Sequence, residues 1–257
     1  MTLIIHRHNV VVGLPDAVLF DIDNTLYSYE PAHQAGITAV RSKTERLFNI
    51  TPEEFDLAFK KARSDVNGRL GKTASSHSRL LYFQSMLETI GLGSQVLLAL
   101  DFEQTYWRTF LSHAVLFDDV KELLDDLRIA GIPTAIVTDL TAQIQFRKLV
   151  YFGLDRYFDY CVTSEEAGAD KPDPAPFRLA LQKIAPKGSG IWMIGDHPTN
   201  DIRGAREHLG AVTLQKLHRG VNVGKEGEAP DCTFTAFADV RHLLTTLQAG
   251  VRRVSNY

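Results

Sequence analysis

The chain has 257 residues, of which 44% are hydrophobic and 23% charged, and its formal net charge is −3. This length and composition predict a globular protein with one large α/β domain, or a core domain and a smaller insert. The small negative charge argues against nucleic-acid binding. The two cysteines are too few for a disulfide framework.

The first strand of the predicted core ends in two acidic residues. Residues 1–15 precede it, and their apolar pattern is too interrupted for a signal peptide, so we expect an extra strand or a contact surface there. The apolar run 17–20 then predicts a buried strand, and Asp21 and Asp23 follow it directly. Two buried carboxylates need a group that compensates their charge.

Residues 28–112 have almost no strand-like run and are predicted to form a helical insert. Thr51 and Glu54 have the spacing of a capping box, and Ser76 is predicted to cap the next helix. Ligands of an open parallel sheet bind beyond the carboxyl ends of the strands, so an insert leaving from that edge could cover the site. We therefore expect a core of residues 1–27 and 113–257 and a second domain of residues 28–112.

After the insert, short apolar runs alternate with helical patterns. Continuous apolar strands separated by helices predict a parallel sheet covered on both faces. The predicted fold class is therefore α/β, with a Rossmann-like core and an inserted helical domain. Strands are predicted at 132–138, 158–163, 190–196, 211–217 and 232–237, and helices at 118–131, 141–152, 174–185, 199–209 and 238–249.

Polar residues that follow these strands should gather at one edge of the sheet. Thr138 and Asp196 each end a strand, Asp201 follows five residues after Asp196, and Lys171 precedes a helix whose start is marked by prolines. Together with the two aspartates of the first strand they form an excess of negative charge. Mg²⁺, a hard cation that prefers oxygen ligands, would neutralise it. The same set suits phosphoryl transfer, in which one carboxylate attacks phosphorus and another transfers protons.

In these features the chain resembles the haloacid dehalogenase-like hydrolase superfamily, in its phosphatase branch with a helical cap. The resemblance rests on four parts in the expected order, and it extends from residue 17 to about residue 210. The insert stands where family members carry the cap. The four parts are DIDNT (21–25), Thr138, Lys171 and GDHPTND (195–201).

The resemblance implies a role for each of these residues. Asp21 would be the nucleophile and Asp23 the general acid and base. Thr138 and Lys171 would bind the phosphoryl group. Mg²⁺ would be bound by Asp21, the backbone carbonyl of Asp23, and Asp196, with Asp201 in support.

Contacts with the substrate are expected from residues outside these four parts. Family phosphatases usually have Thr-Asn-Gly where this chain has Thr138-Asp139-Leu140, so Asp139 is expected to face a cationic substrate group or a cap residue. In the cap, His77 and Arg79 could reach the leaving group, although the polarity of a helix start explains them equally well. His197 is interpreted as a loop side chain.

The function implied is a Mg²⁺-dependent phosphatase that hydrolyses a small phosphomonoester through an aspartyl-phosphate intermediate. A phosphomutase, a haloacid dehalogenase and a binding module without catalysis are the alternatives. Asp23 argues against the dehalogenase, because a halide leaves without a proton. We expect a small phosphorylated metabolite as partner, no nucleic acid or membrane, and a cytoplasmic location; a homodimer stays open.

Overall fold

The computed structural model describes residues 3–254, and the side chains of residues 3–250. The chain divides into two compact units, which we name the α/β unit (residues 1–28 and 115–257) and the helical unit (residues 29–114). The predicted fold class, with a mostly parallel sheet, is confirmed. Among the described residues, no helix combines the length and the apolar character that crossing a membrane requires.

Within residues 3–254, seven strands form one sheet in the order β1-β7-β6-β5-β2-β3-β4. All neighbouring pairs are parallel except β1 and β7, so part of the N-terminal segment forms the extra strand that was one of two expectations. The strands are β1 (Ile4–Ile5), β2 (Ala17–Phe20), β3 (Thr134–Thr138), β4 (Tyr160–Thr163), β5 (Ile191–Gly195), β6 (Val212–Lys216) and β7 (Cys232–Phe234).

The three central strands bring distant parts of the sequence to one edge. Every residue of β2, β3 and β5 is buried, as expected of strands covered on both faces. Phe20 at the end of β2 is aligned with Ile136 of β3 and with Ile194 of β5. Because the strands are parallel, the residues that follow them emerge side by side at the carboxyl edge.

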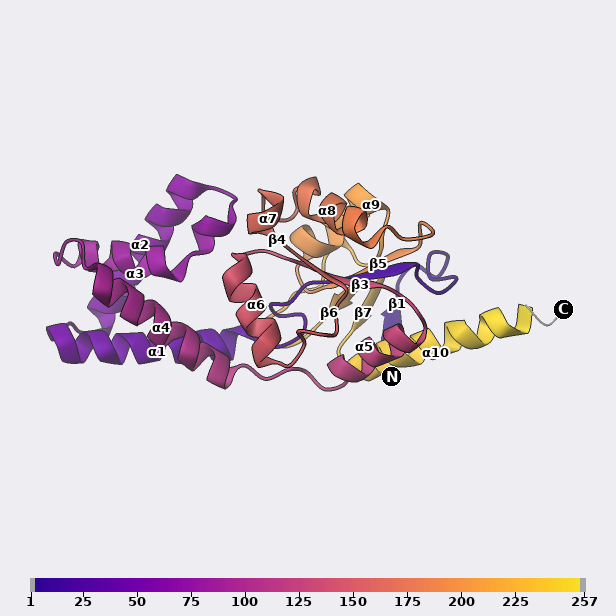
Figure 1. Ribbon diagram of the computed structural model, residues 1–257, viewed down its shortest axis with the longest axis horizontal. Helices are drawn as coiled ribbons and strands as arrows, with labels where there is room; N and C mark the ends of the chain where they lie inside the picture. Colours follow the sequence, from indigo (N-terminus) through magenta and orange to yellow (C-terminus); the bar gives the residue numbers. More distant parts are fainter. Residues whose placement is uncertain (1–2, 255–257) are drawn as a thin grey trace. The chain divides into compact units, whose positions relative to one another are not determined.

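Helices cover both faces of the sheet in the α/β unit. In Figure 1, α8 and α9 lie on one side of the strands and α5 and α10 on the other. On the first side, Phe177 of α8 and Ala205 of α9 pack with Leu19, Val137 and Met193 of the central strands. The helices are α5 (Val120–Ile129), α6 (Ala142–Tyr151), α7 (Ser164–Ala167), α8 (Pro174–Ile184), a π-helical segment (Pro198–Arg203) continuing into α9 (Gly204–Leu209), a 3₁₀ turn (Glu226–Glu228) and α10 (Phe237–Val254).

The helical unit is held together by an aromatic core. Phe83 contacts the rings of Phe59, Phe102 and Tyr106, with centroids 5.6–6.1 Å apart. Gly36 permits the close approach of the first and last helices, because a Cβ atom there would lie 2.8 Å from the Tyr106 ring. The elements are α1 (Tyr29–Phe48), α2 (Pro52–Leu70), a 3₁₀ turn (Ala74–His77), α3 (Arg79–Thr89) and α4 (Val96–His113).

One helix start in this unit was predicted correctly and one was not. The capping box at Thr51 is confirmed, since Thr51 and Glu54 each accept a hydrogen bond from the other's backbone N–H. The prediction that Ser76 caps the next helix was wrong: Ser78 caps α3, and its Oγ accepts the N–H of Leu81. Ser76 instead lies in the 3₁₀ turn that precedes the helix.

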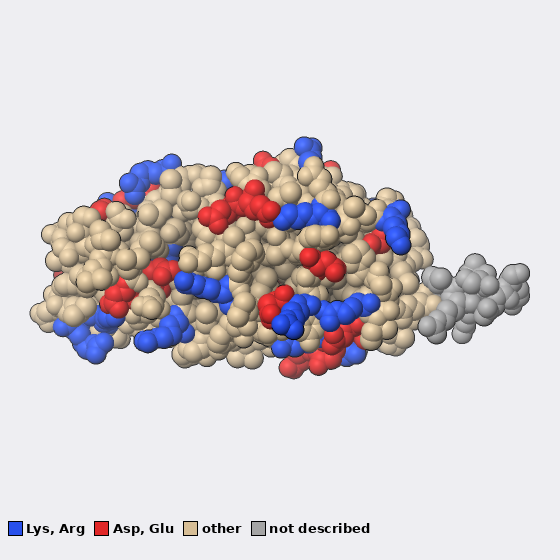
Figure 2. All heavy atoms as spheres, viewed as in Figure 1, with Lys and Arg blue, Asp and Glu red and all other residues tan. Residues whose placement is uncertain are grey.

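On the face shown in Figure 2, acidic and basic side chains are interspersed rather than gathered by sign. This mixture matches a sequence with 28 basic and 31 acidic residues. The concentration of charge that needs an explanation is therefore the acidic group at the carboxyl edge of the sheet, most of which is buried.

Candidate active site

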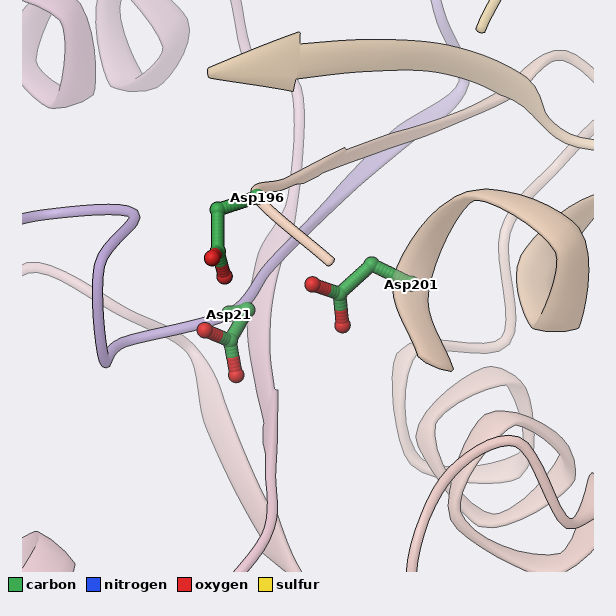
Figure 3. Close-up of side chains that lie close together, drawn as sticks. All are labelled: Asp21, Asp196 and Asp201. Carbon is green, nitrogen blue, oxygen red and sulfur yellow. The ribbon is translucent and has the colours of Figure 1, made fainter. Parts of the chain in front are cut away.

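Within the described part of the chain, the carboxylates of Asp21, Asp196 and Asp201 gather at the carboxyl ends of β2 and β5 (Figure 3). Asp21 directly follows β2, Asp196 follows β5, and Asp201 belongs to the π-helical segment. One oxygen of each carboxylate lies within 4.8 Å of the others, and Figure 3 shows the three side chains directed toward one another. The fold thus brings together three of the four aspartates predicted for the metal site.

Lys171 provides a positive charge next to this group. Its Nζ lies 2.7 Å from Oδ1 of Asp21 and 2.6 Å from Oδ1 of Asp201, and all three side chains are buried. Burial lowers the pKa of Lys171, but the carboxylates of Asp201 and Asp21 outweigh this effect and hold it well above its usual range. The side chain of Lys171 is therefore a positively charged ammonium group between the carboxylates of Asp21 and Asp201.

The acidic residues exceed the charge that this one ammonium can balance. Burial is the largest cause that raises the pKa of Asp196 to about 9 and that of Asp21 to about 7, and the charges of neighbouring carboxylates raise both further. Lys171 opposes the rise in both. Such raised pKa values reflect an excess of buried negative charge, which a bound cation would compensate.

A divalent metal ion fits the donor set. Three carboxylate oxygens close enough to contact one ion are hard ligands, which suit Mg²⁺ better than the metals that nitrogen and sulfur ligands select. Binding would counteract the burial and the repulsion that raise the pKa of Asp21 and Asp196, because a coordinated carboxylate must be deprotonated. A cation bound by these three carboxylates would therefore explain why the first strand ends in buried acidic groups.

Asp23 is engaged by a different set of side chains. Its two carboxylate oxygens lie 2.6 and 2.8 Å from Nζ of Lys148, and the hydroxyl of Tyr27 donates a further hydrogen bond. Burial would raise the pKa of Asp23, but the charge and hydrogen bonds of Lys148 outweigh it, and the pKa is lowered. Without substrate, the carboxylate of Asp23 is thus an anion paired with Lys148, outside the group of three, and it can donate a proton only after it has taken one up.

Thr138 and Asp139 follow β3 and turn toward different neighbours. The hydroxyl oxygen of Thr138 is 2.8 Å from Nε2 of Gln145, which donates to it. The carboxylate of Asp139 accepts the backbone N–H of Lys171 at 2.8 Å and lies 3.5 Å from the amide of Asn200. Asp139 therefore ties the loop that carries Lys171 to the end of β3, and its contact with a cationic substrate group stays a prediction.

Lys148 and Gln145 were not found by reasoning from the sequence. Both belong to the predicted helix 141–152, which is observed as α6, and both are completely or almost completely buried. The available signal was weak, since a long polar side chain at an inward-facing helix position looks like any other until the packing of the helix is known.

The remaining predicted residues have local partners. In the helical unit, the guanidinium of Arg79 donates to the carbonyl of His77 at 2.7 Å and to the hydroxyl of Tyr29, and it lies over the Tyr82 ring. These contacts leave the predicted substrate roles of His77 and Arg79 untested. In the α/β unit, Nδ1 of His197 accepts backbone N–H groups at the start of the π-helical segment.

Comparisons with known proteins agree with this geometry. The model of the haloacid dehalogenase-like hydrolase family matches residues 15–208. The chain is similar to a ribulose-1,5-bisphosphate 5-phosphatase from Halopiger xanaduensis, with 40% identity over 190 residues, 74% of this chain and 80% of that protein. It is 32% identical to a glyceraldehyde 3-phosphate phosphatase from Methanopyrus kandleri over 205 residues, 79% of this chain and 84% of the relative.

A solved structure extends the likeness to the fold. The crystal structure of a HAD phosphatase from Thermococcus onnurineus superimposes with a TM-score of 0.67 at 24% identity. The match covers 89% of this chain and 97% of that chain. With the family match over residues 15–208, the resemblance seen in the sequence is confirmed. The chain belongs to the haloacid dehalogenase-like hydrolases.

Proposed function

We propose that the protein is a Mg²⁺-dependent phosphatase that hydrolyses a small phosphomonoester through an aspartyl-phosphate on Asp21. The observation that carries this proposal is the position of the Asp21 carboxylate, 2.7 Å from the ammonium of Lys171 and next to the carboxylates of Asp196 and Asp201. An anionic nucleophile and an anionic substrate can approach only where positive charge is concentrated. The names of the two relatives, both phosphatases, support the same reaction class.

The first half-reaction transfers the phosphoryl group to the protein. A carboxylate oxygen of Asp21 forms a bond with phosphorus while the bond between phosphorus and the leaving oxygen breaks. The leaving oxygen takes a proton from Asp23, which acts as general acid in the protonated form that the second half-reaction of the preceding turnover leaves. Lys171 at Oδ1 and Thr25 at Oδ2 orient the Asp21 carboxylate, while Lys171 and the hydroxyl of Thr138 bind phosphoryl oxygens.

The second half-reaction releases inorganic phosphate. Asp23 accepts a proton from a water molecule as the water oxygen bonds to phosphorus, and the bond between Asp21 and phosphorus breaks. The carboxylates of Asp21, Asp196 and Asp201 and the backbone carbonyl of Asp23 would hold Mg²⁺. When bound, the ion neutralises negative charge on the phosphoryl oxygens.

The proposed substrate is a small sugar phosphate whose phosphate sits on a primary carbon. The two relatives are named for the 5-phosphate of a ribulose and the 3-phosphate of glyceraldehyde, which are esters of primary alcohols. Because an alkoxide is a poor leaving group, such a substrate needs a proton from Asp23 on its leaving oxygen. We assign the helical unit the role of the cap, with His77 and Arg79 as substrate contacts, and place the protein in the cytoplasm.

The test is phosphate release from a panel of sugar phosphates with Mg²⁺ and no phosphorylated acceptor, a condition that separates hydrolysis from a mutase reaction. We expect Asp21→Asn to fold and to show essentially no turnover. Asp155→Asn, at an exposed aspartate of the same unit, is the matched control and should keep wild-type rates. Substantial hydrolysis of p-nitrophenyl phosphate by Asp21→Asn would refute the proposed nucleophile.

A further inference from the structure

Helix α6 places a buried lysine against the second aspartate of the first strand. The side chain of Lys148 is 1% exposed, and its Nζ lies 2.6 Å and 2.8 Å from the two carboxylate oxygens of Asp23. Burying an ammonium is costly unless a close opposite charge compensates it. Asp23 supplies that charge, although its own side chain stays 30% exposed. The carboxylate of Asp23 is therefore held by Lys148 while part of the side chain remains accessible.

Gln145, one helical turn before Lys148, contacts the same region. Its Nε2 donates to Thr138 Oγ1 at 2.8 Å and to the backbone oxygen of Asp139 at 2.7 Å, and it lies 3.3 Å from Asp23 Oδ2. Its Oε1 is buried without a hydrogen-bond partner among the described side chains. Gln145 therefore connects the end of β3 with the carboxylate of Asp23.

We propose that Lys148 and Gln145 are positioning residues that fix the carboxylate of Asp23 for its two proton transfers. The proposal rests on the function proposed above and deepens it. Neither residue is assigned a contact with substrate. Donors from α6 and the hydroxyl of Tyr27 fix the plane of the carboxylate, and its exposed side is left for the leaving oxygen and the water.

The physical reason is geometric. Proton transfer requires the acid within hydrogen-bond distance of the leaving oxygen, and a misplacement of about 1 Å can cost about a hundredfold in rate. Asp23 stands in a loop after β2, where its side chain would otherwise be free to change rotamer. A side chain held from a regular helix is more precisely placed than one held by its loop alone.

The leaving group distinguishes this role from a merely structural one. Release of p-nitrophenolate needs no proton, whereas release of a primary alcohol does. We therefore measure kcat/KM for p-nitrophenyl phosphate and for glycerol phosphate with the wild type, Lys148→Met, Asp23→Asn and the double variant. We expect Lys148→Met to lose about 100-fold with glycerol phosphate and less than about fivefold with p-nitrophenyl phosphate. The double variant should lose little more activity than Asp23→Asn alone, because both changes impair the same proton transfer.

A second buried lysine serves as the matched control. Lys216 in β6 is equally inaccessible, but its Nζ donates to the backbone oxygens of Leu217 and Thr235. Lys216→Met removes a buried ammonium from the same unit without touching Asp23, so any loss should be equal for both substrates. Tyr27→Phe, which removes one hydroxyl from Asp23, replaces Lys148→Met if the latter does not fold, with the same selective loss expected.

Equal losses with both substrates, or no loss, would overturn the positioning role. A crystal structure of Lys148→Met provides a measurement independent of activity: a changed rotamer of Asp23 supports the proposal, and an unchanged one contradicts it. Activity retained by Asp21→Asn would instead refute the proposed function, and the rotamer of Asp23 would still decide the role of Lys148.

Discussion

Asp196→Asn should make the metal-free protein more stable while removing its response to Mg²⁺. The carboxylate of Asp196 lies within 4.8 Å of those of Asp21 and Asp201, and no ion pair to it is found among the described residues. Lys171 forms its close contacts with the other two carboxylates. Replacing the carboxyl group by a neutral amide of the same shape therefore removes the cost of holding that group there, either as an anion or with a proton taken up, without breaking a salt bridge.

The magnitude follows from the distances. Two unit charges about 5 Å apart in an effective dielectric constant of about 20 repel by about 3 kcal/mol. The charges of Asp201 and Asp21 raise the pKa of Asp196 and that of Lys171 lowers it, so about one such repulsion remains after compensation. We expect the free energy of unfolding without metal to rise by about 2–3 kcal/mol in Asp196→Asn at pH 8.

The sign of the pH dependence follows from the raised pKa. The folded protein raises the pKa of Asp196 from 3.8 to about 9, so between these values the folded state binds more protons than the unfolded state. The contribution of this group to stability is therefore complete below about pH 4 and is lost as the pH rises toward 9. The amide introduced by Asp196→Asn would not titrate, and the advantage of the variant should be larger at pH 8 than at pH 5.

Urea unfolding in the presence of a chelator, followed at pH 5 and pH 8, measures this directly. A higher midpoint at unchanged slope indicates a gain in stability. Mg²⁺ should then raise the midpoint of the wild type and have little effect on the variant, since a ligand stabilises only the state that binds it. A variant less stable than the wild type at pH 8 without metal, or one that keeps the full Mg²⁺ response, would refute the reasoning.

Two further substitutions test the ion pairs and the packing. Lys171→Met leaves the buried carboxylates of Asp21 and Asp201 uncompensated. The free energy of unfolding at pH 8, measured by urea unfolding, should therefore fall by about 3–5 kcal/mol. A fall of less than about 1 kcal/mol would show that the two ion pairs contribute little to stability. Gly36→Ala places a Cβ atom 2.8 Å from the Tyr106 ring and should destabilise the helical unit by about 1–3 kcal/mol, seen as faster amide hydrogen exchange there; unchanged exchange would contradict it.

The carboxyl edge of the sheet could be predicted because strand ends are visible in the sequence. Asp21 and Asp196 each follow an apolar run directly, and parallel strands bring their carboxyl ends to one edge. The pairing of β2 with β5 then places these residues together without any information on side-chain packing. This part of the site needs only periodicity and topology.

The residues around Asp23 could not be predicted in this way. Lys148 and Gln145 lie beside Asp23 because of the way α6 is oriented and packed, and this packing depends on the rest of the unit. Ser76 shows a similar limit on a smaller scale, because two serines two residues apart are equally good caps until the 3₁₀ turn decides between them. Asp139 was expected to face substrate or the cap, and its hydrogen bond to the Lys171 backbone depends on a loop conformation that the sequence does not fix.

The most direct test of the central claim is the identification of the residue that carries the phosphoryl group during turnover. The protein is mixed with Mg²⁺ and glycerol phosphate, quenched in acid, digested and analysed by mass spectrometry. We predict a phosphoryl group on Asp21 that hydroxylamine removes and that does not form without Mg²⁺. A phosphoryl group on another residue, with turnover preserved in Asp21→Asn, would contradict the account.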